Sequence, residues 1–123
     1  MRQNLARAIS QDADSLIITR KIIDGCIEAK ALDIVAIDAS EVSCLFNYFV
    51  IASGNSDRQV QGITNRVTEY MYDCGLKPIS IEGMNLGHWV VVDYSDIVLH
   101  VFYQPLRSHY DLEWLWAKAK RIY

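Results

Sequence analysis

The feature that most restricts the fold is a pair of apolar segments, Trp89–Tyr94 and Ile97–Tyr103, separated by a very short polar break. Both segments are rich in β-branched and aromatic residues, so we predict a β-hairpin with its turn around Tyr94 and Ser95. Successive side chains of a strand point to opposite faces, and one face of this hairpin is almost wholly apolar. Such a face needs cover, so the hairpin predicts a sheet with other elements packed on it.

Helical and strand-like patterns alternate along the rest of the chain. Apolar residues at helical spacing predict a helix over Asp14–Ala31, capped by Asp14 or Ser15, after a flexible lead-in over residues 1–13. Ser56 and Gln59 form a capping-box pattern at the start of a second helix. The side chains that this second helix is expected to bury are Val60, Ile63, Val67, Met71 and Cys74. Further strands are expected at 34–38, 46–52 and 79–82, an irregular segment at 105–110, and a last helix from Asp111.

These elements predict one α/β domain over residues 14–123. The expected order is αββαβββα, with a mixed five-stranded sheet and packed helices. The strand-helix-strand unit over residues 46–82 is long enough for a parallel, right-handed crossover. A chain of 123 residues of which 51% are hydrophobic supplies one packed core.

The charge and cysteine content limit the function. A formal net charge of -3 makes direct nucleic-acid binding a poor fit, because such proteins neutralise phosphates with lysine and arginine, whereas a basic protein partner fits well. The three cysteines form no CxxC pair, so we expect reduced thiols that behave as small apolar side chains in a cytoplasmic protein. The sequence shows no secretory signal pattern and no apolar run long enough to span a bilayer, so we expect no membrane contact.

Two carboxylates lie beside the hairpin turn. In the expected register, Asp93 faces Asp96 and Trp89 faces His100. Like charges that face each other across strands repel, so the two aspartates are either solvated turn formers or the receptor of a cation, from Arg107 or from a partner. Trp89 beside His100 is either a core aromatic against a satisfied histidine or a partly exposed interface anchor.

Motifs for catalysis and cofactor binding are absent from the sequence. The three histidines show no metal-ligand spacing, and no phosphate-binding glycine loop or nucleophile elbow occurs. Gly54, Asn55 and Ser56 precede a helix start where an anion could bind, but a turn with a cap explains them better. The topology with its Gly-x-Ser turn is similar to that of nucleotidyltransferases, yet no D-x-D pair lies on the following strand to hold Mg²⁺. We therefore expect no enzyme activity, no cofactor and no metal site.

Several blocks of the sequence resemble one known family. They are Asn47–Val60, Ile81–Gly83, Trp89–Tyr94, Asp96–Phe102 and the tail Arg107–Trp116, which follows an R-x-x-Y-x-L-E-x-L-W pattern. In this order and spacing they are similar to the Iojap-related ribosomal silencing factors, over about residues 14 to 116. The chain departs from the usual family pattern at Ser95, where glycine is common, and at Trp114, which replaces a polar residue.

The resemblance implies a nucleotidyltransferase-like fold without catalytic residues that represses translation. It implies binding to the large ribosomal subunit through a protein on the intersubunit face, little direct nucleic-acid contact, and a steric block to subunit joining when nutrients are scarce. It also implies homodimers. The partner-binding residues that we expect are Trp89 and Tyr94 as apolar anchors, Asp93, Asp96 and Glu113 as acidic contacts, and Arg107 and Tyr110 as positioning residues. The alternative is a degenerate nucleotidyltransferase-like enzyme or a nucleotide-binding domain.

Overall fold

A computed structural model describes residues 2–41, 46–110, 112 and 119–123, with side chains described from Asp14 onward. Six strands form one mixed sheet in the order β3–β4–β5–β2–β1–β6. The strands are β1 (Leu32–Asp38), β2 (Tyr48–Gly54), β3 (Ser80–Glu82), β4 (Trp89–Asp93), β5 (Ile97–Tyr103) and β6 (Lys120–Arg121). β2 and β5 run parallel, and the other neighbouring pairs are antiparallel.

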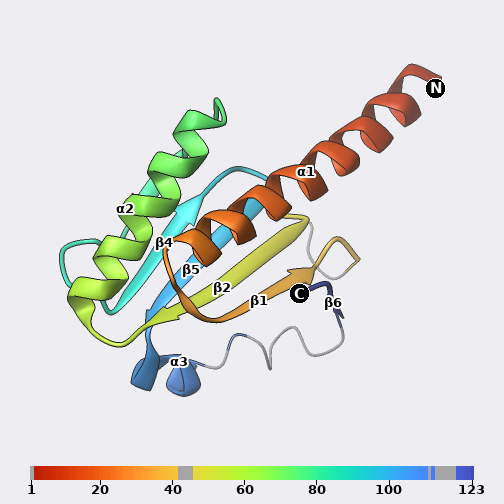
Figure 1. The fold of residues 1–123 in the computed structure, drawn as a ribbon. Helices are drawn as coiled ribbons and strands as arrows, with labels where there is room; N and C mark the ends of the chain where they lie inside the picture. Colours follow the sequence, from red (N-terminus) through yellow and green to blue (C-terminus); the bar gives the residue numbers. More distant parts are fainter. Residues whose placement is uncertain (1, 42–45, 111, 113–118) are drawn as a thin grey trace.

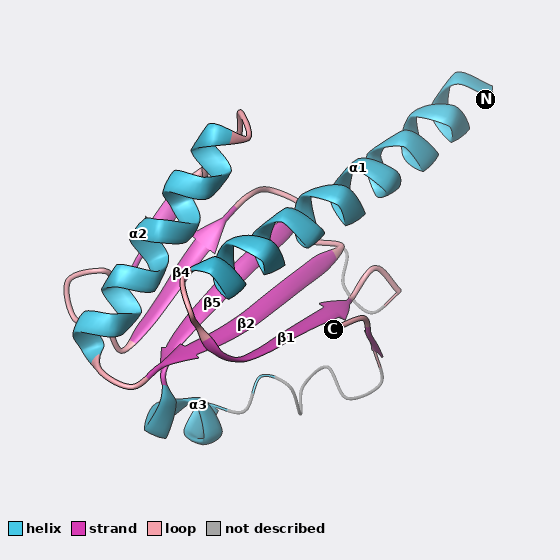
Figure 2. Ribbon diagram, in the orientation of Figure 1, coloured by secondary structure: helices cyan, strands magenta, loops and turns pink. Residues whose placement is uncertain are grey.

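Two long helices cover one face of this sheet. α1 (Arg2–Glu28) and α2 (Asp57–Asp73) lie side by side over the strands, and the N-terminal half of α1 extends beyond the sheet (Figure 1). The short helix α3 (Gln104–Tyr110) follows β5 directly and lies beyond the end of the strands (Figure 2). None of the described helices is both long enough and apolar enough to cross a lipid bilayer.

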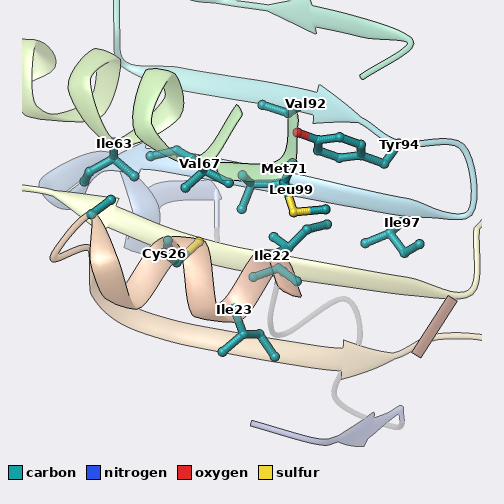
Figure 3. Packing of buried hydrophobic residues seen from close by; sticks show 14 of the residues in the cluster. Ile22, Ile23, Cys26, Ile63, Val67, Met71, Val92, Tyr94, Ile97 and Leu99 are labelled. Carbon is teal, nitrogen blue, oxygen red and sulfur yellow. The ribbon is translucent and has the colours of Figure 1, made fainter. Parts of the chain in front are cut away.

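The main core lies between the sheet and the two long helices (Figure 3). Ile22 and Cys26 of α1 and Val67 and Met71 of α2 pack in this core with Leu99 of β5, and none of these side chains is exposed. Burial raises the pKa of the Cys26 thiol to about 12, so Cys26 stays protonated and packs as a small apolar side chain. A smaller cluster on the opposite face consists of Val35, Ile37, Phe49, Ile51 and Phe102.

Signals that act over a few residues are confirmed. Ser56 is the N-cap of α2, and its hydroxyl accepts a hydrogen bond from the Gln59 amide at 3.0 Å. The Gln59 side chain accepts from the Asn55 amide, one residue before the position that a capping box specifies. Gly75 follows α2 with φ of 85°, as expected for a helix end of this type. The strands predicted at 34–38, 46–52 and 79–82 are present, with ends that differ by a few residues.

The first helix begins earlier than predicted. α1 begins at Arg2, because residues 2–13 contain neither glycine nor proline to stop it, so the predicted start at Asp14 is wrong. Ser15 is accordingly no cap: it is buried within the helix, and its hydroxyl donates to Asp96 Oδ2 at 3.4 Å. Whether the lead-in is flexible remains a prediction.

Differences also occur at the C-terminal end. Residues 104–110 form α3, although an irregular segment was the expectation there, and β6 adds a sixth strand to the predicted five. β6 pairs with β1, which lies far away in the sequence, and a segment of two residues is too short to predict such a pairing. The last helix, predicted from Asp111, falls largely outside the described residues.

The hairpin register is wrong by two residues. Val91 faces His100, and Asp93 faces Val98, so Asp93 and Asp96 do not oppose each other. The turn forms around Ser95 because the Asp93 carboxylate accepts the Ser95 amide at 2.7 Å and Ser95 adopts φ of 75°. A shift of two keeps every side chain on its predicted face, so the division into an apolar and a mixed face is confirmed.

Two smaller expectations also change. Cys74 lies at the C-cap of α2 and is exposed, although it was predicted on the buried stripe, because the stripe ends with the last helical turn at Met71. β3 runs in the same direction as β2, as the crossover predicts, but β4 and β5 lie between them.

Candidate partner-binding face

The face of β3, β4 and β5 that points away from α1 and α2 carries most of the candidate residues. We define the partner face by Glu82 of β3, Trp89, Val91 and Asp93 of β4, Val98 and His100 of β5, and Tyr110 of α3. Glu82 and Tyr110 are exposed and the other five are half-buried, so apolar and acidic groups both reach the surface. A surface of this composition suits a protein partner with basic residues around an apolar centre.

Aromatic rings form the apolar end of the partner face. The Trp89 ring lies 4.7 Å from the Tyr110 ring and 5.2 Å from the Phe102 ring, centroid to centroid. The Trp89 indole N–H donates to His100 Nδ1 at 3.0 Å, so the interpretation of Trp89 as an aromatic packed against a satisfied histidine is confirmed. Trp89 is also half-buried, and its role as an interface anchor stays a prediction. Tyr110 is 45% exposed and extends this aromatic surface outward.

Arg107 fixes the helix that carries Tyr110. The guanidinium is buried, and its Nη1 donates to Ser53 Oγ at 2.8 Å and to the backbone carbonyl of Asp33. Gln104 adds a bond from the same helix, to Asp33 Oδ2 at 2.9 Å. Asp33 has φ of 48° at an irregularity of β1, which turns its carbonyl toward α3. This arrangement supports the predicted positioning role of Arg107.

The carboxylates lie at the other end of the hairpin. Asp93 is four residues from Trp89 along β4, about 13 Å for an extended strand. Two hydrogen bonds hold Asp96 in place. Its carboxylate accepts from the Ser15 hydroxyl, and its backbone carbonyl accepts from the Asn47 amide at 2.7 Å. Arg107 lies beyond the opposite end of β5, so the alternative in which the two aspartates receive the Arg107 cation is wrong.

Tyr94 was predicted as an anchor, and the structure places it elsewhere. Its ring lies in the core on the opposite face of the sheet, near Val92 and Ile97, and is 8% exposed (Figure 3). Its buried hydroxyl has no hydrogen-bond partner among the described residues. Burial, with the nearby Cys26, raises the Tyr94 pKa to about 12. The prediction of Tyr94 as a surface anchor is therefore wrong, because its side chain is buried in the core. Glu113 and Trp114 lie outside the described residues.

Glu82 and Val91 complete the partner face, although sequence analysis did not select them. The alternation of the hairpin already assigned Val91 to the same face as Trp89. Glu82 could not be assigned in this way, because its place beside Val91 depends on the antiparallel pairing of β3 with β4. Among the described residues, no group of three histidine, cysteine, aspartate or glutamate side chains could hold a metal ion.

His100 makes a testable contribution to stability. Burial lowers its pKa to about 4, below the value near 6.5 of an unfolded histidine. The unfolded chain therefore binds a proton more readily between these values, and stability falls as the pH drops through this range. We expect the wild type to lose about 2 kcal/mol through this group between pH 7.5 and pH 5 in urea unfolding.

The His100→Gln variant isolates this effect. Glutamine can still accept the Trp89 indole N–H, but it does not titrate. Between pH 7.5 and pH 5 the unfolding free energy of the variant should therefore fall by about 2 kcal/mol less than that of the wild type. His88→Gln is the matched control, since His88 is exposed. Equal pH slopes for His100→Gln and the wild type would contradict the assignment.

Comparisons with known proteins identify the family. The family model "Ribosomal silencing factor during starvation" matches residues 11–123. A ribosomal silencing factor of Bacillus subtilis is 40% identical over 94 residues, which cover 76% of this chain and 80% of that protein. A mouse protein named for mitochondrial assembly of the ribosomal large subunit is 32% identical over 94 residues, covering 73% of this chain and 41% of that protein.

Solved structures agree with the sequence comparisons. A crystal structure of a protein from Chromobacterium violaceum has a TM-score of 0.80 at 34% identity, and the match covers 83% of this chain and 85% of that one. A protein from Bacillus halodurans has a TM-score of 0.74 at 31% identity, covering 82% and 94%. The chain therefore belongs to the ribosomal silencing factor (RsfS) family and is a ribosome-associated regulator of translation.

Proposed function

We propose that this chain binds the large ribosomal subunit through a basic ribosomal protein on the intersubunit face, and that it blocks joining of the small subunit when nutrients are scarce. The observation that carries the proposal is the partner face, where half-buried Trp89 and exposed Tyr110 adjoin a surface that bears Glu82 and Asp93. Family membership supports the ribosomal part of the proposal, and the chemistry of this face supports a basic partner.

The two ends of the partner face have different tasks. A few well-packed aromatic side chains carry much of the binding energy at protein interfaces. Tyr110 was expected only to position the last segment, but it is exposed beside Trp89, so it replaces the buried Tyr94 as the second anchor in this proposal. Charged groups at a rim mainly set orientation and association rate, so Glu82 and Asp93 would steer a cationic surface into register. Asp96 lies outside the partner face, at the adjoining turn beside Ser15 of α1, and would add to this charge. Placing a domain of 14.1 kDa on a subunit contact prevents docking without any chemical step. Homodimer formation and a cytoplasmic location remain predictions.

Charge removal at the hairpin turn tests the proposal. Asp93→Asn combined with Asp96→Asn keeps an oxygen to accept from the Ser95 amide and from the Ser15 hydroxyl, so the turn should survive. We expect binding to isolated large subunits, measured by co-sedimentation, to weaken at least about tenfold, with the effect shrinking at high salt.

The matched control removes two exposed carboxylates elsewhere. Glu69→Gln with Asp73→Asn neutralises side chains that line a groove between α1 and α2, on the other face of the sheet. This variant should bind as the wild type does. Equal weakening by both pairs would indicate a general charge effect, and absence of the wild type from every ribosomal fraction would reject the proposed function.

A further inference from the structure

The edge strand β3 leaves one side of the sheet open. β3 is the terminal strand of the described sheet and pairs with β4 alone, while its three residues, Ser80–Glu82, are all exposed. An open edge presents backbone N–H and C=O groups that can pair with another extended chain. Proteins often protect such edges with lysine. Here the strand itself carries no lysine, and Lys77, three residues before it in the sequence, lies over the Tyr72 ring at 5.3 Å.

The two faces of β3 differ in chemistry. Ile81 shares the helix-covered face with Val92 and is 41% exposed, and Ile79 just before the strand is 69% exposed. Glu82 lies on the other face, the partner face, where Asp93 of β4 also lies. An extended chain laid along β3 would therefore place alternate side chains against isoleucine on one face and against carboxylates on the other.

We propose that the outer edge of β3 accepts an extended segment of the basic partner as an added strand, with apolar side chains toward Ile81 and cationic side chains toward Glu82 and Asp93. This inference rests on the proposed function, because the segment belongs to the same ribosomal protein. Strand addition takes affinity from main-chain hydrogen bonds and specificity from alternate side chains. Three residues supply few such bonds, so the added strand sets the register of the partner while Trp89 and Tyr110 anchor it.

A second copy of this chain fits the same edge less well. Pairing two β3 strands would bring both copies of Glu82 and Asp93 into one sheet face, where like charges repel. A segment that carries lysine or arginine at alternate positions has the opposite effect. Charge complementarity therefore favours the basic partner over self-association.

Ile81→Lys tests the inference on the full chain with isolated large subunits. A lysine on the open edge should block strand addition, whereas the fold should tolerate it because the side chain is already exposed. We expect binding to weaken at least about tenfold in co-sedimentation. Ile17→Lys, at a position of α1 that is 54% exposed, is the matched control and should bind as the wild type does. In the wild-type complex, those amides of Ser80–Glu82 that point away from β4 should exchange hydrogen more slowly than in the free protein.

Each outcome separates the two proposals. If the wild type binds, Ile81→Lys binds equally and the β3 amides show no added protection, the edge inference is overturned and the proposed function stands. If the wild type fails to bind large subunits, both fail. If Ile81→Lys instead abolishes self-association of the free protein without affecting ribosome binding, the edge serves a second copy, and the inference is again overturned.

Discussion

Gly83→Ala is expected to lower the free energy of unfolding by about 4 kcal/mol. Gly83 has φ of 89°, which only glycine adopts readily, and a Cβ at this position would overlap the carbonyl oxygen of Trp89. That carbonyl belongs to the first residue of β4, so the backbone between β3 and β4 would have to move. The substitution should therefore move the backbone that carries Trp89 of the partner face. Urea unfolding measures the loss of stability.

The controls for Gly83 come from the same chain. Gly62 lies within α2 with open space where a Cβ would be, so Gly62→Ala should raise stability by about 0.5 to 1 kcal/mol. Gly75 has φ of 85° but no close neighbour, so Gly75→Ala isolates backbone strain, about 1 kcal/mol. A loss below 1 kcal/mol for Gly83→Ala would show that the loop relaxes easily and would contradict the prediction.

Features decided within a few residues could be predicted from the sequence. The cap at Ser56, the helix end at Gly75 and the split of the hairpin into two faces depend on side chains that are neighbours in the chain. The assignment of side chains to the two faces tolerates the error in register, because a shift of two residues leaves every side chain on its face. The same alternation placed Tyr94 on the apolar face, so its prediction as a surface anchor ignored a signal that was already present.

Features that depend on distant partners could not be predicted. The hairpin register is a separate case, because its turn is local: the Ser95 amide donates to the Asp93 carboxylate, but more than one short turn is compatible with these residues. β6 exists through its pairing with β1, and the buried contacts of Arg107 depend on a carbonyl of Asp33, 74 residues away. Short segments carry too little pattern to specify such pairs, so the partner face could be located on the hairpin but not completed from the sequence.

Arg107→Met is expected to cost about 3 kcal/mol of stability, although methionine can fill much of the apolar volume. The buried hydroxyl of Ser53 and the carbonyl of Asp33 would each lose the donor that the structure gives them. α3 would then be free to tilt, and Tyr110 would no longer be held against Trp89. The indole N–H of Trp89 reports this in a proton-nitrogen correlation spectrum, because it donates to His100 beside the same rings.

Two variants separate anchoring by Arg107 from a general effect on α3. Gln104→Ala removes an exposed hydrogen bond from the same helix to the same aspartate, and it should cost less than about 1 kcal/mol and leave the Trp89 signal in place. Arg107→Lys keeps the charge, but its ammonium differs in shape and position from the planar guanidinium whose Nη1 reaches both acceptors, so an intermediate loss is expected. If Arg107→Met unfolded with wild-type free energy and an unchanged Trp89 signal, α3 would be held by other contacts, and the position of Tyr110 on the partner face would not depend on this arginine.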